Sequence, residues 1–293
     1  MDISDFLAKH QLPISYQQQC EQFFIPVAKN ILHAKKTNTP LFVAINGSQG
    51  SGKTTLADFL VTWLAKNSSF NSIALSIDDF YLTKQRRLQL AKNVHPLLAT
   101  RGVPGTHDVA LMKSTLEQLL AGHSGVPLPH FNKHLDDSAP HNEWPRNNTA
   151  VDIIILEGWC VGSKAQSASA LTAPLNELEQ NADSQGVWRN YVNNCLKTEY
   201  LNIFAKVDYL VMLKAPSFAA VFAWRKEQEQ EQKLIALKGQ GAGTMNDAQL
   251  RYFIAHFERV TRENLNTLAS TANALVTLNE QREISCLEFK LIN

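Results

Sequence analysis

The feature that most constrains this chain is a glycine-rich segment between an apolar run and a helical pattern. Residues 47–55 read GSQGSGKTT and match G-x-x-x-x-G-K-[ST]; the run LFVAI precedes them and LADFLVTWLAK follows. Glycines let the backbone turn tightly enough to point successive N–H groups inward, and the positive end of the following helix dipole adds to their effect. The segment therefore predicts a strand, an anion-binding loop and a helix, in that order.

The anion that best fits such a loop is the triphosphate of a nucleotide. Lys53 would reach the β- and γ-phosphates, and the hydroxyl of Thr54 would bind Mg²⁺. The alternative, a glycine-rich turn with a chance lysine, is disfavoured because the pattern and both flanks agree. The predicted nucleotide-binding residues are Gly47, Ser48, Gln49, Gly50, Ser51, Gly52, Lys53, Thr54 and Thr55.

Strand patterns recur along the chain with helical stretches between them. Most are near-continuous apolar runs, which are typical of strands buried on both faces. They predict an α/β fold in which a parallel sheet is flanked by helices on both faces. The strand patterns lie at 41–45, 72–77, 151–156, 209–214, 273–278 and 284–290.

The chain of 293 residues, 44% of them hydrophobic, is long for one domain but usual for an α/β fold. We expect a single domain over 1–293, with an N-terminal helix at about 15–36, bent or shortened at Pro26. The segment 84–150 is rich in Pro, Gly and His, and only 108–122 in it has a clear helical pattern. Long irregular segments are usually functional, so this one is the expected substrate region.

Composition narrows the possible partners. The net charge of +1 comes from dispersed basic residues, so there is no electrostatic footprint for nucleic acid or an anionic membrane, and a small molecule is the expected substrate. Four cysteines without C-x-x-C spacing fit a reducing cytoplasm. The N-terminus lacks the pattern of a signal peptide, and the longest apolar runs are too short to span a bilayer. The oligomeric state is not predicted.

Carboxylates follow two of the strand patterns. Asp78 and Asp79 come after SIALSI, and Glu157 comes after VDIIIL. In open α/β sheets ligands bind beyond the carboxyl ends of the strands, so these acids should lie near the phosphate loop. A kinase needs one carboxylate to orient or deprotonate the accepting hydroxyl and another acid near Mg²⁺. The structural alternative is a helix cap or a plain charge at a strand end.

Five segments occur in a characteristic order: GSQGSGKTT, SIDDFYLT, RGVPGTHDV, LPHFNKHLDDSAP and ILEGWCVG. With them the chain resembles the P-loop small-molecule kinases that include uridine kinase, phosphoribulokinase and pantothenate kinase, and most closely the D-glycerate 3-kinase-like branch. The resemblance runs from about residue 40 to the C-terminal helix. SIDDFYLT and EGW are more specific to this branch than the phosphate loop, which many NTPases share.

The resemblance implies roles for the strand-end acids. It makes Asp78 the general base for the substrate hydroxyl and Asp79 secondary, although which of the two acts stays open. It gives Glu157 a place near Mg²⁺ or a part in positioning Asp78. Lys53 joins these residues as a predicted catalytic group.

The resemblance also implies an acceptor site in the irregular region. His107 and Asp108 would contact substrate, and Arg101 and Lys133 are candidate partners for a substrate carboxylate. Relatives often have aspartate where this chain has Asn132. For each of the four candidates, the alternative is an ordinary loop residue.

A lid is expected at about 216–243. An apolar stripe there continues into Arg225, which by analogy with related kinases would stabilise charge on the transferring phosphoryl group. The alternative is a surface arginine that covers the end of the stripe. A metal site is a further, less favoured hypothesis for the loop histidines, because no helical pattern pairs them. These histidines are His95, His107, His130, His134 and His141.

Together these patterns predict an ATP-dependent kinase that uses Mg²⁺ to phosphorylate a hydroxyl of a small metabolite. D-glycerate is the acceptor that the resemblance favours. The alternatives are another acceptor, such as a nucleoside, pantothenate or a sugar phosphate, or a non-catalytic ATP-binding or regulatory protein. A GTPase is disfavoured, since the chain has no N-K-x-D element for guanine.

Overall fold

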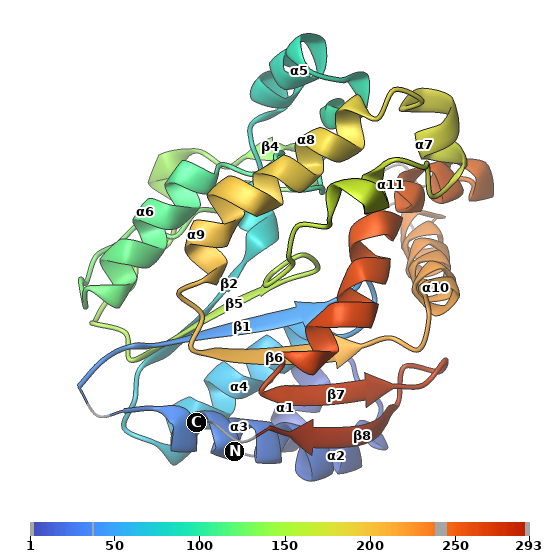
Figure 1. Ribbon diagram of the computed structural model, residues 1–293. Coiled ribbons are helices and arrows are strands. Elements are labelled where there is room, and N and C mark those ends of the chain that lie inside the picture. The colour runs from blue at the N-terminus through green and yellow to red at the C-terminus, as the bar shows by residue number, and fades with distance from the viewer. Residues whose placement is uncertain (1–2, 37, 238–244, 291–293) are drawn as a thin grey trace.

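The computed structural model describes residues 3–36, 38–237 and 245–290. Its centre is a sheet of six strands in the order β2-β5-β1-β6-β7-β8 (Figure 1). The first five strands run parallel, and β8 pairs antiparallel with β7 at the edge. The predicted α/β class with a parallel sheet is thus confirmed, with β8 as an antiparallel addition. The bounds are β1 Leu41–Gly47, β2 Ser72–Ser76, β5 Ile153–Gly158, β6 Tyr209–Lys214, β7 Ala274–Leu278 and β8 Ile284–Phe289.

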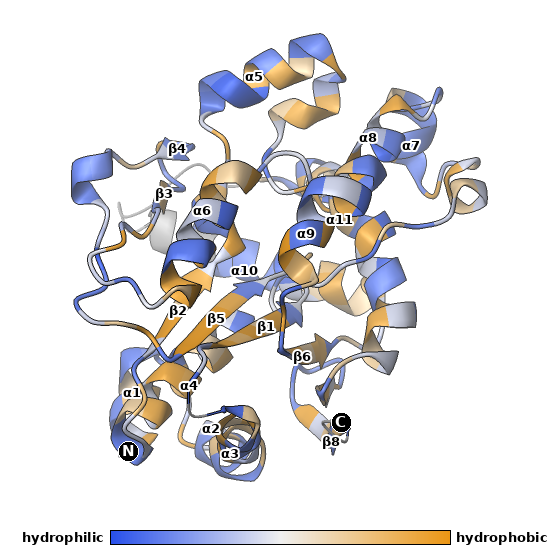
Figure 2. Cartoon of the chain, turned by 60° about the vertical axis from the view of Figure 1, so that its left-hand side comes forward, coloured by the Kyte–Doolittle hydropathy of each residue, from blue (hydrophilic) through white to orange (hydrophobic). Residues whose placement is uncertain are grey.

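The central strands are buried on both faces, as their continuous apolar sequences predict. Every residue of β1 and β5 is buried, and these strands are mostly in the hydrophobic colour in Figure 2. Because successive side chains of a strand point to opposite faces, Phe42 and Ala44 enter one core while Val43 and Ile45 enter the other. The sheet therefore divides the interior into two hydrophobic cores.

Helices cover both faces of the sheet (Figure 1). One face packs against α1 (Ile3–Lys9), α3 (Ile25–Ala34), α4 (Lys53–Asn67) and the start of α10 (Phe218–Leu237). The other packs against α6 (Val109–Leu120), α7 (Glu177–Ala182), α8 (Val187–Cys195), α9 (Leu201–Phe204) and α11 (Asp247–Thr267). None of the described helices is long and apolar enough to cross a membrane. Of the predicted lid, residues 238–243 lie outside the described residues.

The N-terminal segment predicted at 15–36 is helical in three parts. Helix α2 (Tyr16–Gln19) leads through a π-helical turn at Cys20–Phe24 into α3. Pro26 lies in the first turn of α3, directly after the π-helical turn, and the backbone is right-handed helical through the junction, so the change of helix type falls next to the residue that lacks an N–H donor. Val27, Ala28 and Ile31 then pack into the core beside β1.

The expectation that 108–122 alone is helical within 84–150 is wrong. A second helix, α5, spans Lys84–Asn93 and is capped by Thr83, whose Oγ1 accepts a hydrogen bond from the N–H of Arg86 at 3.3 Å. The buried residue of α5 is Arg87, which is only 1% exposed and donates to the carbonyl of Leu82 at 2.8 Å. Because the buried side chain of α5 is charged, the sequence of this helix lacks the periodic apolar stripe by which amphipathic helices are predicted.

Candidate active site

The phosphate loop adopts a backbone that requires glycine. Gly50 and Gly52 have φ of +78° and +86°, a region that residues with a Cβ rarely adopt. A Cβ at Gly50 would lie 2.9 Å from Cβ of Trp224, and one at Gly47 would lie 2.5 Å from Oγ of Ser51. The loop is therefore packed closely between β1, α4 and the start of α10.

The loop has the features that a bound phosphate needs. Ser48 and Ser51 are buried, and among the described residues no group forms a hydrogen bond with either hydroxyl oxygen. Buried hydroxyls without partners are unfavourable unless a ligand satisfies them. Lys53 follows at the first position of α4, where the positive end of the helix dipole lies. Unpartnered hydroxyls, a lysine and a helix N-terminus thus converge on one anion-binding loop.

Thr54 and Glu157 form the candidate magnesium site. The hydroxyl of Thr54 donates to Oε1 of Glu157 at 2.8 Å, and Nζ of Lys53 lies 4.0 Å from Oε2. Glu157 is 3% exposed at the end of β5, between Ile45 of β1 and Ser76 of β2. Mg²⁺ prefers carboxylate and hydroxyl oxygens and phosphate, so these two side chains beside a phosphate loop fit it.

The loop histidines do not form a metal site within the described residues. No group of three or more His, Cys, Asp or Glu side chains lies together there in a way that could hold a metal ion. The metal hypothesis for these histidines therefore has no structural support.

Asp78, the predicted base, lies just beyond the end of β2 and contacts two donors. Nζ of Lys133 lies 2.8 Å from its Oδ2, and the hydroxyl of Tyr81 donates to its Oδ1 at 2.7 Å. Burial alone would raise the pKa of Asp78. The charges of Lys133 and Lys53, with the hydrogen bonds from Lys133 and Tyr81, outweigh it and lower the pKa to about 2. Asp78 is thus an ionised carboxylate beside an ammonium group.

Asp79 has different surroundings. Its Oδ1 accepts a hydrogen bond from the N–H of Phe131 at 3.1 Å and lies 3.3 Å from Nδ1 of His130. Burial raises the pKa of this carboxyl above its usual value. Asp79 therefore anchors the segment that carries Lys133, while Asp78 contacts Lys133 itself. The two carboxylates thus differ in their contacts, and the assignment of the base to Asp78 stays a prediction.

A short hairpin carries one of the residues predicted to bind the acceptor. Strands β3 (Phe131–Asn132) and β4 (Asp137–Ser138) pair antiparallel, and Lys133 lies in the turn between them. Arg101 pairs with Asp136 of the same turn. The guanidinium carbons of Arg87 and Arg101 lie 5.7 and 5.6 Å from the centre of the Phe131 ring. Lys133 thus lies on the hairpin and Arg101 contacts the hairpin from outside it, and each of the two cations pairs with a carboxylate of the chain.

His107 is buried beneath the same region. Its ring stacks on Tyr81 at 4.6 Å between centroids, and its Nδ1 lies 2.6 Å from the hydroxyl of Tyr200. Burial lowers the pKa of His107 to about 4, so the ring is neutral near pH 7. Its Nε2 has no hydrogen-bond partner among the described residues, which leaves one ring nitrogen for a ligand or a water.

Asp108 has structural partners for both carboxylate oxygens. It caps α6, where its Oδ1 accepts from the N–H of Leu111 at 3.1 Å, and its Oδ2 pairs with Arg86. Its backbone N–H donates to the carbonyl of Phe80 at 2.6 Å. These contacts favour the helix-cap alternative for this residue, and its predicted contact with substrate stays a prediction.

The EGW segment connects the predicted magnesium ligand Glu157 with the segments predicted to bind the acceptor. Trp159 donates from its ring N–H to the carbonyl of Gly102 at 3.0 Å. A Cβ at Gly158 would lie 2.3 Å from Cγ2 of Ile77, so only glycine lets β5 pass this close to the start of the DDFY segment. The tripeptide therefore holds Glu157 close to the start of the DDFY segment and to the loop that contains Gly102.

Arg225 lies on the first half of α10. Its Nη2 is 2.9 Å from Oε2 of Glu229, and its Nη1 is buried without a hydrogen-bond partner among the described residues. Glu229 in turn accepts a hydrogen bond from the N–H of Met245, just before α11. The preceding residue, Trp224, packs against Gly50 of the phosphate loop. The structure thus brings the helix of Arg225 onto the loop.

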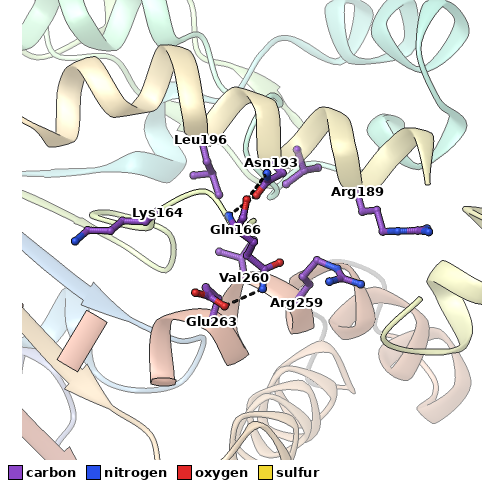
Figure 3. A pocket seen from close by; sticks show the side chains of 9 residues that line it. Lys164, Gln166, Arg189, Asn193, Leu196, Arg259, Val260 and Glu263 are labelled. Atoms are coloured by element: carbon purple, nitrogen blue, oxygen red, sulfur yellow. Dashed lines mark hydrogen bonds between the residues drawn. The ribbon is translucent and has the colours of Figure 1, made fainter. Parts of the chain in front are cut away.

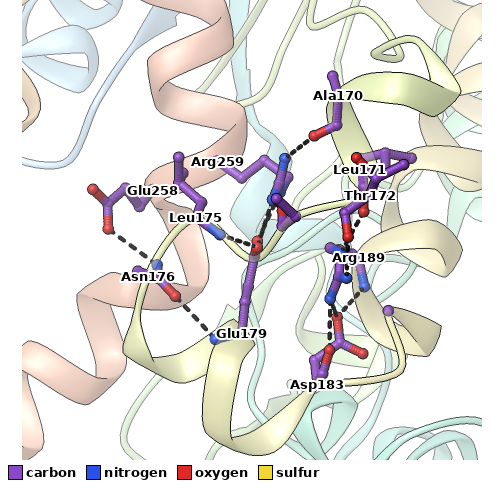
Figure 4. Close-up of polar contacts among 12 residues, drawn as sticks. Ala170, Leu171, Thr172, Leu175, Asn176, Glu179, Asp183, Arg189, Glu258 and Arg259 are labelled. Atoms are coloured by element: carbon purple, nitrogen blue, oxygen red, sulfur yellow. Dashed lines mark hydrogen bonds and ion pairs between the residues drawn. The ribbon is translucent and has the colours of Figure 1, made fainter.

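Residues 163–205, to which the sequence assigns no role, contain α7 and α8, which share a hydrophobic core with α11. Figure 4 shows two buried ion pairs: Arg259 of α11 with Glu179 of α7, and Arg189 of α8 with Asp183. In the second pair, Nη1 of Arg189 lies 2.9 Å from Oδ2 of Asp183. Phe257, two residues before Arg259, packs against Trp159 and fills the space that a Cβ at Gly102 would need.

A small cavity lies between α8 and α11 (Figure 3), and no residue of the phosphate loop lines it. Its volume is about 10 Å³, room for about one water molecule. The polar groups around Gln166 bond to one another, since its N–H donates to Asn193 at 2.7 Å and its side chain to Glu263 at 2.8 Å. The cavity is therefore a gap in helix packing that is too small for a substrate.

Two tyrosines that the sequence analysis did not single out contact predicted site residues: Tyr81 donates to Asp78, and Tyr200 contacts His107. Tyr81 could have been found, because it ends the DDFY segment three residues after Asp78. Tyr200 could not, because 93 residues separate it from His107 and its own surroundings form a plain helical pattern.

Comparison with known proteins finds kinases among the relatives of this chain. No family model matches the chain. An uncharacterised kinase of Schizosaccharomyces pombe is 33% identical over 232 residues, which cover 76% of this chain and 80% of that protein. A chloroplastic D-glycerate 3-kinase of Arabidopsis thaliana is 30% identical over 238 residues, or 78% of this chain, which matches only 48% of the plant protein. A probable ATP-dependent kinase of Saccharomyces cerevisiae is 29% identical over 84% of this chain and 87% of its own.

Among solved structures, a D-glycerate 3-kinase from Cryptococcus neoformans has a TM-score of 0.72 at 24% identity. The match covers 95% of this chain and all of that one. At this identity the match establishes the fold.

A phosphate loop between strand and helix, with carboxylates at the ends of the neighbouring strands, is the arrangement of a P-loop NTPase, and the relatives narrow this class to kinases. The chain belongs to the family of P-loop small-molecule kinases that includes D-glycerate 3-kinase. It is an ATP-dependent kinase of a small molecule. The prediction of an enzyme is thereby confirmed over that of a non-catalytic ATP-binding protein.

Proposed function

We propose that this kinase transfers the γ-phosphoryl group of ATP to a hydroxyl of D-glycerate. The observation that carries the proposal is the contact between Asp78 and Lys133 at 2.8 Å, close beyond the phosphate-binding edge of the sheet. D-glycerate carries a hydroxyl and a carboxylate, and it needs a base for the first and a cation for the second. Two relatives that bear the name D-glycerate 3-kinase add support.

In the proposed reaction Asp78 orients the acceptor hydroxyl and takes its proton. The hydroxyl oxygen bonds to the γ-phosphorus while the bond from this phosphorus to the β–γ bridging oxygen breaks, and ADP leaves with that electron pair. Lys53 and the N–H groups of the loop neutralise the phosphates. Most of the rate enhancement in such a transfer comes from positioning and electrostatics.

The acceptor would be held from two sides. Lys133 and Arg101 would bind its carboxylate, and the unpartnered Nε2 of His107 would contact one of its hydroxyls. A neutral imidazole can donate from this nitrogen or accept at it, depending on its tautomer.

Magnesium is part of the proposal. Thr54 and Glu157 would hold Mg²⁺, whose charge neutralises the β- and γ-phosphate oxygens when it is bound. The hydrogen bond between these two side chains at 2.8 Å supports this assignment, because oxygens that are already adjacent need little rearrangement to share an ion.

We further propose that the chain acts as one kinase domain with α10 as its lid. Arg225 would turn from Glu229 to the transferring phosphoryl group when ATP binds. The buried, unpartnered Nη1 of Arg225 supports this role, since a guanidinium nitrogen without a partner is unfavourable in the unliganded state.

A cytoplasmic location is also proposed. Cys20, Cys160 and Cys195 are buried free thiols, Cys286 is exposed and free, and this state fits a reducing compartment.

The first experiment is a phosphorylation assay with purified protein, ATP and Mg²⁺. D-glycerate, uridine, pantothenate and ribulose 5-phosphate are compared as acceptors, and ADP formation is measured. Stimulation by D-glycerate alone is expected, with a phosphorylated product identified by mass spectrometry. Stimulation by another compound would keep the kinase chemistry and reject D-glycerate as the acceptor.

A further inference from the structure

The ion pair between Lys133 and Asp78 has a consequence for the unliganded enzyme. Each oxygen of the Asp78 carboxylate already has a donor, since Tyr81 contacts Oδ1 and Lys133 contacts Oδ2. The same contacts, with the charge of Lys53, lower the pKa of Asp78 to about 2 despite its burial. A carboxylate with such a low pKa is a weak general base near neutral pH. Without an acceptor, the proposed base is therefore held in an inactive form.

Lys133 is free to change partner without any movement of the backbone. Its side chain is 61% exposed, whereas that of Asp78 is 26% exposed. The hairpin beneath it is fixed, because the N–H of Phe131 donates to Asp79 at 3.1 Å and Oδ1 of Asn132 accepts from the N–H groups of His134 and Leu135 at 3.0 and 3.1 Å. Lysine carries its charge on a flexible four-carbon stem, so rotation of the side chain is enough to move it.

We propose that Lys133 blocks Asp78 until the carboxylate of an incoming acceptor draws the ammonium group away, so that an acidic acceptor activates the base that deprotonates it. This inference rests on the proposed function. It makes Lys133 both a specificity residue for acids and a guard against hydrolysis of ATP by water.

The chemistry of the acceptor fits such an exchange. D-glycerate bears its carboxylate and its terminal hydroxyl on one three-carbon chain, so Lys133 can take the first while the second lies at Asp78. The hydroxyl proton then passes to Asp78 as the oxygen bonds to the γ-phosphorus and ADP leaves. Glycerol has the same carbon chain and no carboxylate, and it leaves the Lys133–Asp78 ion pair intact.

A simpler role for Lys133 makes different predictions. If it only bound the acceptor carboxylate, its loss would raise the KM for D-glycerate and leave the hydrolysis of ATP without acceptor unchanged. The rate of that hydrolysis therefore distinguishes the two roles.

The first test uses the wild-type protein. D-lactate retains the carboxylate of D-glycerate and lacks the terminal hydroxyl, so it should release Asp78 while leaving the acceptor position to water. We expect D-lactate to inhibit phosphorylation of D-glycerate and to raise hydrolysis of ATP to ADP and phosphate by about tenfold, a part of the 10²- to 10⁴-fold that a positioned general base typically contributes. Glycerol at the same concentration should give no rise. Inhibition by D-lactate without a rise in hydrolysis would overturn the proposal, and so would a failure to inhibit.

The second test removes the ammonium group. Lys133→Gln should raise hydrolysis without acceptor by about tenfold, lose the response to D-lactate and lower kcat/KM for D-glycerate. The double variant Lys133→Gln, Asp78→Asn should return to the wild-type rate, because the gain depends on the freed carboxylate. Lys92→Gln, at an exposed position near the end of α5, is the matched control and should behave as wild type. Unchanged hydrolysis in folded Lys133→Gln would contradict the proposal.

The two proposals fail in different ways. If D-glycerate gives no phosphorylated product with wild-type protein, the acceptor assignment is rejected. Hydrolysis by Lys133→Gln is still measured in that case, because it needs only ATP, Mg²⁺ and water. A rise that depends on Asp78 would support the blocking role, and the wild-type rate would reject it.

Discussion

The two sides of the candidate site are built by different means. The phosphate side is one continuous segment, 47–55, whose binding groups are mostly backbone N–H groups held by glycines with positive φ. The acceptor side consists of side chains from 78–81, 101–108 and 131–136, which tertiary contacts bring together. A site made of backbone depends on conformation, and a site made of side chains depends on individual functional groups. Substitutions should therefore separate nucleotide binding from turnover.

The largest effect is expected at Asp78. Asp78→Asn removes the proposed base and keeps the shape of the side chain, so kcat should fall by about 10²- to 10⁴-fold while the affinity for ATP changes little. Asp79→Asn is the matched control, since Asp79 holds the hairpin through the N–H of Phe131. Steady-state kinetics and nucleotide titration measure both quantities. If kcat instead collapsed in Asp79→Asn and stayed normal in Asp78→Asn, Asp79 would be the base and Asp78 would not.

The next effect concerns stability on the acceptor side. The pKa of His107 is lowered by burial to about 4, against an ordinary value of 6.5. Between these two pH values His107 is therefore protonated in the unfolded chain and neutral in the folded chain. Stability is therefore full above the ordinary pKa and falls as pH decreases toward the folded pKa, by about 2 kcal/mol between about pH 7 and pH 5.

The variant His107→Gln cannot take up this proton, so its thermal midpoint should depend less on pH than that of the wild type. Burial lowers the pKa of His256 as well, so the wild-type slope contains a second contribution and only the difference between the two proteins is informative. Equal slopes for both proteins would mean that His107 titrates alike in the folded and unfolded states.

The same contrast explains what could be read from the sequence. The phosphate loop could be predicted because its function lies in contiguous residues, and the apolar strands because burial on both faces leaves an unmistakable composition. Helix α5 could not, since the residue that it buries is Arg87. The partners of His107 and Lys133 could not be found either, because they lie 93 and 55 residues away and no periodicity reports contacts between loops.

The phosphate side can be tested by a pair of glycines. Gly50 and Gly122 both have φ of +78°, but a Cβ at Gly122 would meet nothing within 4 Å, whereas one at Gly50 would lie 2.9 Å from Trp224. Alanine at either position should cost about 1–2 kcal/mol of stability from backbone strain. Only Gly50→Ala should also raise the KM for ATP, by about tenfold for each 1.4 kcal/mol of lost binding. Equal KM values in the two variants would mean that this backbone is not needed for nucleotide binding.

The smallest effect is expected at Asp108, and it tests whether this residue contacts the acceptor. Asp108 caps α6 through the N–H of Leu111, and asparagine caps a helix about as well as aspartate. Asp108→Asn should therefore keep the KM for D-glycerate and most of the stability, whereas Asp108→Ala should lose about 1 kcal/mol of unfolding free energy with the same KM. Chemical denaturation and acceptor kinetics measure the two quantities. If Asp108→Asn instead raised the KM for D-glycerate by about tenfold or more, the carboxylate would contact the acceptor as the family resemblance implies, and the acceptor side would extend to the start of α6.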